Sequence, residues 1–136
     1  EMSASLVGSE MCIRDRKENY PMASEVIFGS FSDISGKVAL TANDYAVVMT
    51  PGHQADYEIL SQVLGSDATY IGCIGSRTKV AKTRERLKGD GYTEEDIARV
   101  HAPIGLPILA ETPEEIAISI AAEMIEHRAR LAGQRH

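Results

Sequence analysis

Cysteine is scarce in this sequence, and long hydrophobic runs are absent from it. The two cysteines, Cys12 and Cys73, lie far apart and match neither a CxxC motif nor a Cys–His spacing, which argues against a disulfide framework and against a zinc site. No apolar run approaches the roughly 18 residues that a membrane-spanning helix needs. No charged and then apolar leader with a small-residue cleavage site is visible. We therefore expect a water-soluble protein of the reducing cytoplasm, with no membrane partner.

Positive charge is also in short supply. The chain has 14 lysines and arginines against 20 aspartates and glutamates, a net charge of −6, and the acidic residues are spread along the chain. This balance argues against nucleic acid or an anionic membrane as the main partner, so any site for an anion must be local. A chain of 136 residues is the size of one domain and can bury a core without disulfides or a structural metal.

The first residues look foreign to the domain. The segment Ser5–Arg16 has no clear helical or strand period, and a codon string that resembles the transposase adapter of sequencing libraries can encode it. We expect residues 1–16 to be non-native and residues 17–136 to form a partial domain. Two alternatives stay open. The segment could be a genuine disordered N-terminus, or its alternating stretch "EMCIRD", residues 10–15, could mimic a strand and fill an edge of the sheet.

Short apolar runs alternate with amphipathic segments in the middle of the chain. The runs predict strands over 24–29, 45–50 and 69–75, and the amphipathic segments predict helices over 54–64 and 77–88. Continuous apolar runs are typical of strands covered on both faces. The order strand, helix, strand, helix therefore predicts an α/β fold, with a mostly parallel sheet flanked by helices.

The last third of the chain carries two helix-start signals. Thr93 with Asp96 predicts a short helix over 93–100, and Thr112 with Glu115, around a proline at the first helical position, predicts a second start. The residues between the two helices, 101–111, are rich in proline and glycine and read as a loop.

The final helix has an apolar pattern of its own. Ile116, Ile120 and Met124 form one row that predicts the buried face. Ala117 and Ala121 are small, and we expect them to permit close approach of the helix to the sheet.

Candidate chemistry gathers where the strands over 45–50 and 69–75 end, because ligands of open parallel sheets lie beyond the carboxyl ends of the strands. Gly72 and Gly75 allow close approach of a ligand, Ser76 precedes a helix whose free N–H groups attract anions, and Arg77 and Lys79 add positive charge. The pattern predicts an anion site, although it lacks the Lys-Ser/Thr of a phosphate-binding Walker loop. The alternative is a glycine turn followed by a solvated basic helix face.

Other polar residues offer weaker candidates. His53 and Asp56 start the helix after the strand over 45–50, where they could bind a ligand, share a proton or take a divalent metal. A capped, hydrogen-bonded helix start is the more common role of such a pair. His101 reads as a loop residue whose position could let it fold over a ligand. Cys73 lies in a buried strand, where a thiol is usually inert, so a nucleophilic role is not expected.

Four blocks taken together, "TPGHQADYEIL", "YIGCIGSRTK", "HAPIGL" and "ETPEEIAISIAAEMI", resemble the C-terminal Rossmann-type domain of the XdhC/CoxI family, the xanthine dehydrogenase accessory factors. The resemblance covers about residues 17–130. It implies a three-layer Rossmann-like fold and a cytoplasmic accessory protein that binds the molybdenum cofactor, molybdopterin. It further implies sulfuration of this cofactor with a cysteine desulfurase and delivery to a molybdenum hydroxylase such as xanthine dehydrogenase. The implied role is that of a chaperone, without catalytic residues of its own.

The family motifs map onto particular positions of this chain. The threonine-histidine exit corresponds to Thr50 with His53, and the acidic residue beyond it to Asp56. As a departure from the family, Pro51 precedes the Gly-His step, and we expect Gly52 of this step to contact the cofactor as well. The Gly-Ser-Arg loop corresponds to residues 75–77, and the His-Ala-Pro-Ile-Gly-Leu block is intact over residues 101–106.

Two departures from the family pattern follow that block. Pro107 and Leu109 stand where the family usually has an acidic residue and a glycine.

The sequence also lacks the glycine-rich motif with which domains of this family begin. Such domains open with a strand, a G-x-G-x-x-G turn and a second strand ending in Asp-Asp-Arg, and no G-x-G-x-x-G occurs in the sequence. We expect the first strand–helix–strand unit to be missing, with a gap between the strands over 24–29 and 45–50. Two other functions stay open: an NAD(P)-dependent oxidoreductase-like domain, and a non-catalytic module that docks a hydroxylase or desulfurase. A homodimer stays open as the oligomeric state.

Overall fold

A computed structural model describes residues 5–8, 25–28, 36, 38–50 and 53–133. Its elements, in chain order, are β1 (Ser5–Gly8), β2 (Glu25–Phe28), β3 (Tyr45–Val48), α1 (His53–Leu64), β4 (Tyr70–Cys73), α2 (Arg77–Gly89), α3 (Glu94–Ala98), β5 (Val100–His101) and α4 (Pro113–Leu131).

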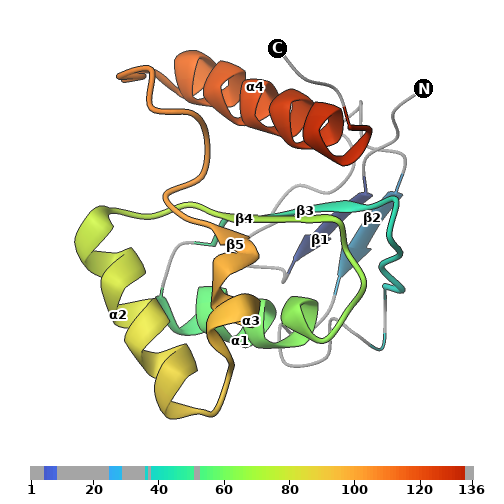
Figure 1. Cartoon of the computed structure of the whole chain (residues 1–136), viewed down its shortest axis with the longest axis vertical. Coiled ribbons are helices and arrows are strands. Elements are labelled where there is room, and N and C mark those ends of the chain that lie inside the picture. The colour runs from blue at the N-terminus through green and yellow to red at the C-terminus, as the bar shows by residue number, and fades with distance from the viewer. Residues whose placement is uncertain (1–4, 9–24, 29–35, 37, 51–52, 134–136) are drawn as a thin grey trace.

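The described strands form two parallel sheets (Figure 1). In one, β4 lies between β3 and β5, with Tyr45 opposite Tyr70 and Gly72 opposite His101. In the other, β1 pairs with β2. Figure 1 shows α4 on one side of the three-stranded sheet and α1, with α2 and α3, on the other side. Three parallel strands between helices confirm the predicted α/β, Rossmann-like class.

The two sheets are not joined in the described part of the chain. The described residues give β2 no pairing with β3, which agrees with the gap expected between these strands. The strand β1 was not predicted. It lies within residues 1–16, which the sequence analysis expects to be non-native. Whether residues 1–16 belong to the natural protein stays a prediction.

The prediction of a loop over 101–111 was wrong at its start. His101 belongs to β5, a strand of Val100 and His101 that pairs with β4. Two residues are too few to show a strand period in the sequence, and only the pairing with β4 defines the element. Both predicted capping boxes, Thr93 with Asp96 and Thr112 with Glu115, are present.

The larger core lies between the sheet and α1, where Leu60, Ile71 and Leu87 are fully buried. The face toward α4 has a smaller core of Tyr70, Ile104 and Ile120.

The prediction for two alanines of α4 was also wrong. Ala117 and Ala121 are exposed and line a groove beside the sheet. The helix turns its row of Ile116, Ile120 and Met124 toward Tyr70 instead.

Arg99 fixes the turn that leads into β4. Its guanidinium donates to the carbonyl oxygens of Leu64 at 3.1 Å, Ser66 at 3.2 Å and Ala68 at 3.1 Å. Hydrogen bonds from a charged group contribute about 1.5–3 kcal/mol, so we expect Arg99→Ala to lower the free energy of unfolding by about 2 kcal/mol. Urea unfolding followed by circular dichroism measures this loss.

Arg84 provides the matched control. Its guanidinium is exposed and donates to one carbonyl, that of Ala102, at 3.1 Å. An exposed hydrogen bond of this kind contributes little, so Arg84→Ala should cost less than about 1 kcal/mol. Equal losses for the two variants would contradict the role given to Arg99.

Candidate functional site

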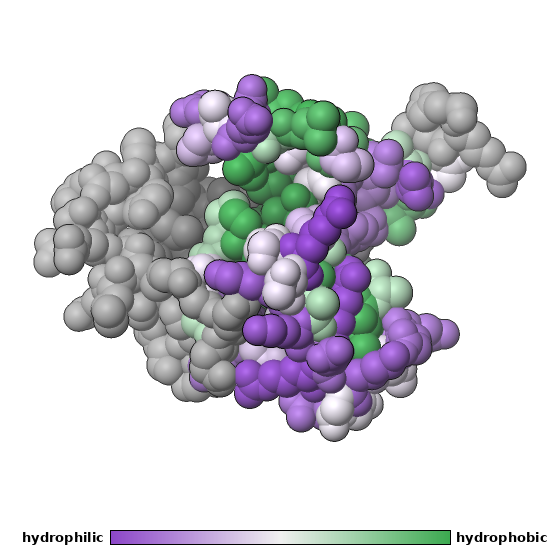
Figure 2. Space-filling model, turned by 90° about the vertical axis from the view of Figure 1, so that its left-hand side faces the viewer, coloured by the Kyte–Doolittle hydropathy of each residue, from purple (hydrophilic) through white to green (hydrophobic). Residues whose placement is uncertain are grey.

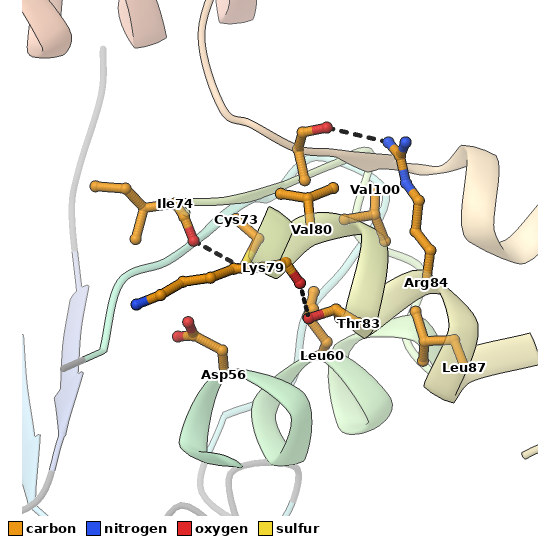
Figure 3. A pocket seen from close by; sticks show the side chains of 11 residues that line it. Asp56, Leu60, Cys73, Ile74, Lys79, Val80, Thr83, Arg84, Leu87 and Val100 are labelled. Carbon is orange, nitrogen blue, oxygen red and sulfur yellow. Dashed lines mark hydrogen bonds between the residues drawn. The ribbon is translucent and has the colours of Figure 1, made fainter. Parts of the chain in front are cut away.

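The loops that follow β3 and β4 come together at one edge of the sheet. Thr50 follows β3, Asp56 lies in the first turn of α1, and Gly75 and Ser76 connect β4 to α2. A narrow crevice of about 20 Å³ opens between α1, the end of β4, α2 and the β5 segment. Figure 3 shows Asp56 reaching into it from α1 and Lys79 from α2. Such a volume holds a water molecule but no cofactor, so a larger ligand would lie at the mouth of the crevice.

Asp56 connects the end of β3 to the start of α1 through hydrogen bonds. Its carboxylate is buried and accepts hydrogen bonds from the Thr50 backbone N–H at 3.1 Å and the Thr50 hydroxyl at 2.6 Å. These bonds tie the exit of β3 to the first turn of α1. The contacts favour the structural reading of Asp56, that of a hydrogen-bonded helix start.

The turn from β4 into α2 leaves the backbone N–H groups at the N-terminus of α2 accessible. Gly75 has a φ of +155°, and a Cβ at this position would meet only ordinary contacts from Lys79 and Val80. The Ser76 hydroxyl accepts from the Lys79 N–H at 3.3 Å, and the Ser76 carbonyl accepts from the Val80 N–H at 2.9 Å. The first N–H groups of an α-helix, here those of Arg77 and Thr78, have no partner within the helix. Within the described part of the chain neither N–H has a hydrogen-bond partner, so both can meet an anion.

Exposed positive charge surrounds this helix start. The residues Ser76, Arg77, Thr78 and Lys79 are all exposed. The first turn of α2 contains no acidic residue. The helix dipole and two cations thus act in the same direction, toward binding a negative group.

Cys73 lies directly behind the turn and is not a reactive group. Its thiol is buried, and burial together with the charge of Asp56 raises the pKa of Cys73 to about 12. The thiol is therefore protonated at neutral pH and a poor nucleophile. The structure agrees with the expectation that this cysteine is inert.

Gly72 has a packing role. A Cβ at Gly72 would lie 2.4 Å from the Ile104 side chain and 2.8 Å from the Tyr70 hydroxyl, so only glycine fits beneath the loop after β5. A ligand contact at Gly72 stays a prediction.

His101 lies on the α4 side of the sheet. Its ring stacks on Tyr70 with 4.7 Å between centroids, and its Nδ1 lies 3.8 Å from the Glu123 carboxylate. Burial lowers the pKa of His101, against the opposing effect of Glu123, so the ring is neutral at pH 7. A ligand contact at His101 stays a prediction.

A polar cluster around His101 was missed by the sequence analysis. The Glu123 carboxylate accepts from the Tyr70 hydroxyl at 2.5 Å and from the Gly105 N–H at 3.1 Å. His127 lies 2.7 Å from the Thr69 carbonyl through Nε2. The available signal was the spacing of Glu123 and His127, four residues apart on one helix face, next to the apolar row.

Two predicted site residues cannot be placed fully. Gly52 lies outside the described residues, and for His53 the structure gives only its position as the first residue of α1. Their contact with a ligand stays a prediction. In the described ranges, no group of three or more His, Cys, Asp or Glu side chains could hold a metal ion. No helix in that same part of the chain has the length and apolar character to cross a membrane.

Comparison with known proteins relates this chain to one family. The model of the XdhC Rossmann domain matches residues 3–124. The chain is 31% identical over 131 residues to the protein named "Uncharacterized protein YqeB" of Escherichia coli (strain K12), covering 91% of this chain and 24% of that protein. It is 33% identical over 113 residues to a probable xanthine dehydrogenase subunit from Bacillus subtilis (strain 168), covering 83% of this chain and 32% of that protein.

A solved structure gives the same result. The fold superimposes with a TM-score of 0.75 on a crystal structure described as a xanthine dehydrogenase from Bacillus halodurans. The sequences are 31% identical, and the match covers 93% of this chain and 35% of that one. The chain thus spans about a third or less of the length of each of these proteins. Because the family model covers most of the residues and the fold agrees, this chain belongs to the XdhC Rossmann domain family.

Proposed function

We propose that this domain serves an accessory protein for molybdenum hydroxylases of the xanthine dehydrogenase type. In this proposal the protein is a maturation chaperone that binds the molybdenum cofactor for sulfuration and insertion. Membership in the XdhC family and the similarity to a probable xanthine dehydrogenase subunit from Bacillus subtilis support it. The observation that carries the proposal for this chain is the open, basic helix start after Gly75.

The Gly75 turn fits the phosphate of molybdopterin. The N–H groups of Arg77 and Thr78 supply donors, Arg77 and Lys79 supply charge, and the backbone is bare at Gly75, where a Cβ would make only ordinary contacts. Packing explains the glycine at Gly72, and the φ of +155° favours glycine at Gly75. In this proposal the missing side chain at Gly75 also lets the phosphate approach the backbone closely.

The proposed partners follow from the same role. A molybdenum hydroxylase would receive the cofactor, and a cysteine desulfurase would supply the sulfur. The cofactor, when bound, supplies the molybdenum chemistry, and the residues of this chain hold and shield it. The proposed compartment is the cytoplasm, and the net charge of −6 argues against nucleic acid as a further partner.

Reconstitution of an apo-hydroxylase tests the chaperone role. Purified chain is mixed with molybdenum cofactor released from a donor enzyme, free cofactor is removed by gel filtration, and the protein fraction is added to apo-xanthine dehydrogenase. We expect xanthine oxidation to appear with the wild-type chain and to fall strongly with Arg77→Ala.

Arg130→Ala is the control for that assay. Arg130 is exposed, lies in the last turn of α4 and pairs with Glu126 at 3.4 Å, away from the Gly75 turn. This variant should transfer cofactor like the wild type. A protein fraction that confers no activity would contradict the chaperone role, and stable retention of NAD or NADP in that fraction would favour the oxidoreductase-like alternative.

A further inference from the structure

The helix α4 carries an apolar flank that faces solvent. Ile118 is 62% exposed and Ile125 is 56% exposed, and Ala121 between them is exposed as well. From Ile116 to Ala122 the helix contains no charged residue at all. A helix that packs one face on a sheet normally turns polar residues to water on its other side. The outer flank of α4 breaks this rule over two turns.

This flank continues into a groove of about 440 Å³ between α4 and the sheet. Val47 and Met49 of the β3 segment form part of its floor, and Ala117 and Ala121 form part of its helical wall. In Figure 2, apolar side chains gather at the top of the molecule, over α4, and further apolar side chains line a hollow beneath them. Small-molecule sites usually include several placed polar groups, and the lining residues here are all apolar, which favours a protein segment as the occupant.

The spacing along this flank is that of a coiled-coil seam. Glu114, Ile118, Ala121, Ile125 and Arg128 follow one another at intervals of four, three, four and three residues, which keeps them on one stripe of the helix. The stripe begins with the acidic Glu114, has the small side chain of Ala121 at its middle and ends with the basic Arg128. Ala121 is equally far from Glu114 and Arg128 in sequence.

The charged ends of the seam are available for a contact outside the chain. Arg130, on the other flank, pairs with Glu126, whereas no ion pair to Glu114 or Arg128 is found among the residues that the structure describes. A second copy of α4 that runs antiparallel and crosses at Ala121 would place its Arg128 beside Glu114, and its Glu114 beside Arg128. The seam is therefore complementary in charge to itself under a two-fold rotation.

We propose that the occupant of this surface is a second copy of the chain, in a homodimer with antiparallel α4 helices. Ala121 lies at the crossing point, where a small side chain lets the two helices approach closely. Ile118 of one copy packs beside Ile125 of the other, next to the groove. This assembly does not depend on the cofactor or on the Gly75 turn.

A charge exchange tests the register of the dimer. Sedimentation velocity across a concentration series should show a species of twice the 14.8 kDa chain mass. Glu114→Arg alone and Arg128→Glu alone place like charges together, and each should weaken the dimer about tenfold or more. The double variant restores opposite charges across the two-fold and should return the dimer constant close to that of the wild type. Circular dichroism confirms that these surface variants stay folded.

A cysteine at the crossing point gives a second readout. In a Cys12→Ser background, Ala121→Cys should form a disulfide-linked dimer on mild oxidation, because the two positions meet at the axis. Glu126→Cys lies on the opposite flank and should remain monomeric under the same conditions. A monomer at every concentration would overturn the proposal, as would a dimer that ignores both single charge reversals or links equally through both cysteines.

Discussion

Gly105→Ala is expected to lower the free energy of unfolding by about 3 kcal/mol, because the new methyl group has no space and the backbone is unsuited to it. A Cβ at Gly105 would lie 2.4 Å from the Ser119 hydroxyl and 3.3 Å from the Ser119 backbone carbon. The same loop is bound to α4 through the Gly105 N–H to Glu123 at 3.1 Å and the Leu106 N–H to Ser119 at 3.1 Å. The substitution therefore pushes α4 away from the sheet. Urea unfolding measures the loss.

Gly91→Ala separates the two causes. Gly91 has a φ of +96°, close to the +97° of Gly105, and a Cβ at Gly91 would meet no atom within 4 Å. The left-handed conformation alone costs a non-glycine residue about 1–2 kcal/mol, so Gly91→Ala should show only that loss. If both variants lose the same stability, close contact with α4 is not what requires glycine in the "HAPIGL" block.

Arg77→Ala is expected to weaken binding of molybdopterin by about one to two orders of magnitude, since a charge-assisted hydrogen bond contributes roughly 1.5–3 kcal/mol. Gly75→Val should weaken it further. A β-branched side chain opposes the φ of +155° and covers the backbone that the phosphate is proposed to approach. Equilibrium titration of the purified variants gives the dissociation constants.

Stability must be followed in the same samples. The Cβ contacts at Gly75 are ordinary, so Gly75→Ala should stay folded and bind better than Gly75→Val. Arg130→Ala should bind like the wild type. If the Arg77→Ala and Gly75→Val proteins are folded and bind molybdopterin with unchanged affinity, the Gly75 turn does not bind the phosphate and the ligand lies elsewhere.

Local chemistry explains which elements could be predicted. Three neighbouring residues, Thr112, Pro113 and Glu115, predict the start of α4. The structure shows the capping box that they predict. The start of α2 at Ser76 is local in the same way. The apolar runs of β3 and β4 are short but continuous, so their hydrophobicity alone indicated a parallel sheet. All four residues of β4 are buried, whereas in β3 only Val48 is.

Elements and contacts that depend on distant residues could not be predicted. The strand β5 exists through its pairing with β4, and its two residues have no pattern of their own. The cluster of Tyr70, His101 and Glu123 joins three elements that are far apart in sequence. Likewise, the pattern of α4 marked a buried row and could not tell which flank the sheet would leave open.

The candidate site divides along the same line. The sequence indicated the glycine turn, the helix that starts after Ser76 and the cations of α2, all of which are local. It could not show that Asp56 Oδ1 accepts two hydrogen bonds from Thr50, because that contact joins the end of β3 to the first turn of α1. It also could not show that His101 faces α4.

Calorimetric titration of the chain with molybdopterin tests the central claim most directly, with NAD, NADP and CTP titrated in parallel. We expect saturable binding of molybdopterin that inorganic phosphate competes with and that Arg77→Ala weakens, while Arg130→Ala leaves it unchanged. Absence of molybdopterin binding by the folded chain, or binding that is insensitive to both phosphate and Arg77→Ala, would contradict the claim that the Gly75 turn holds the cofactor.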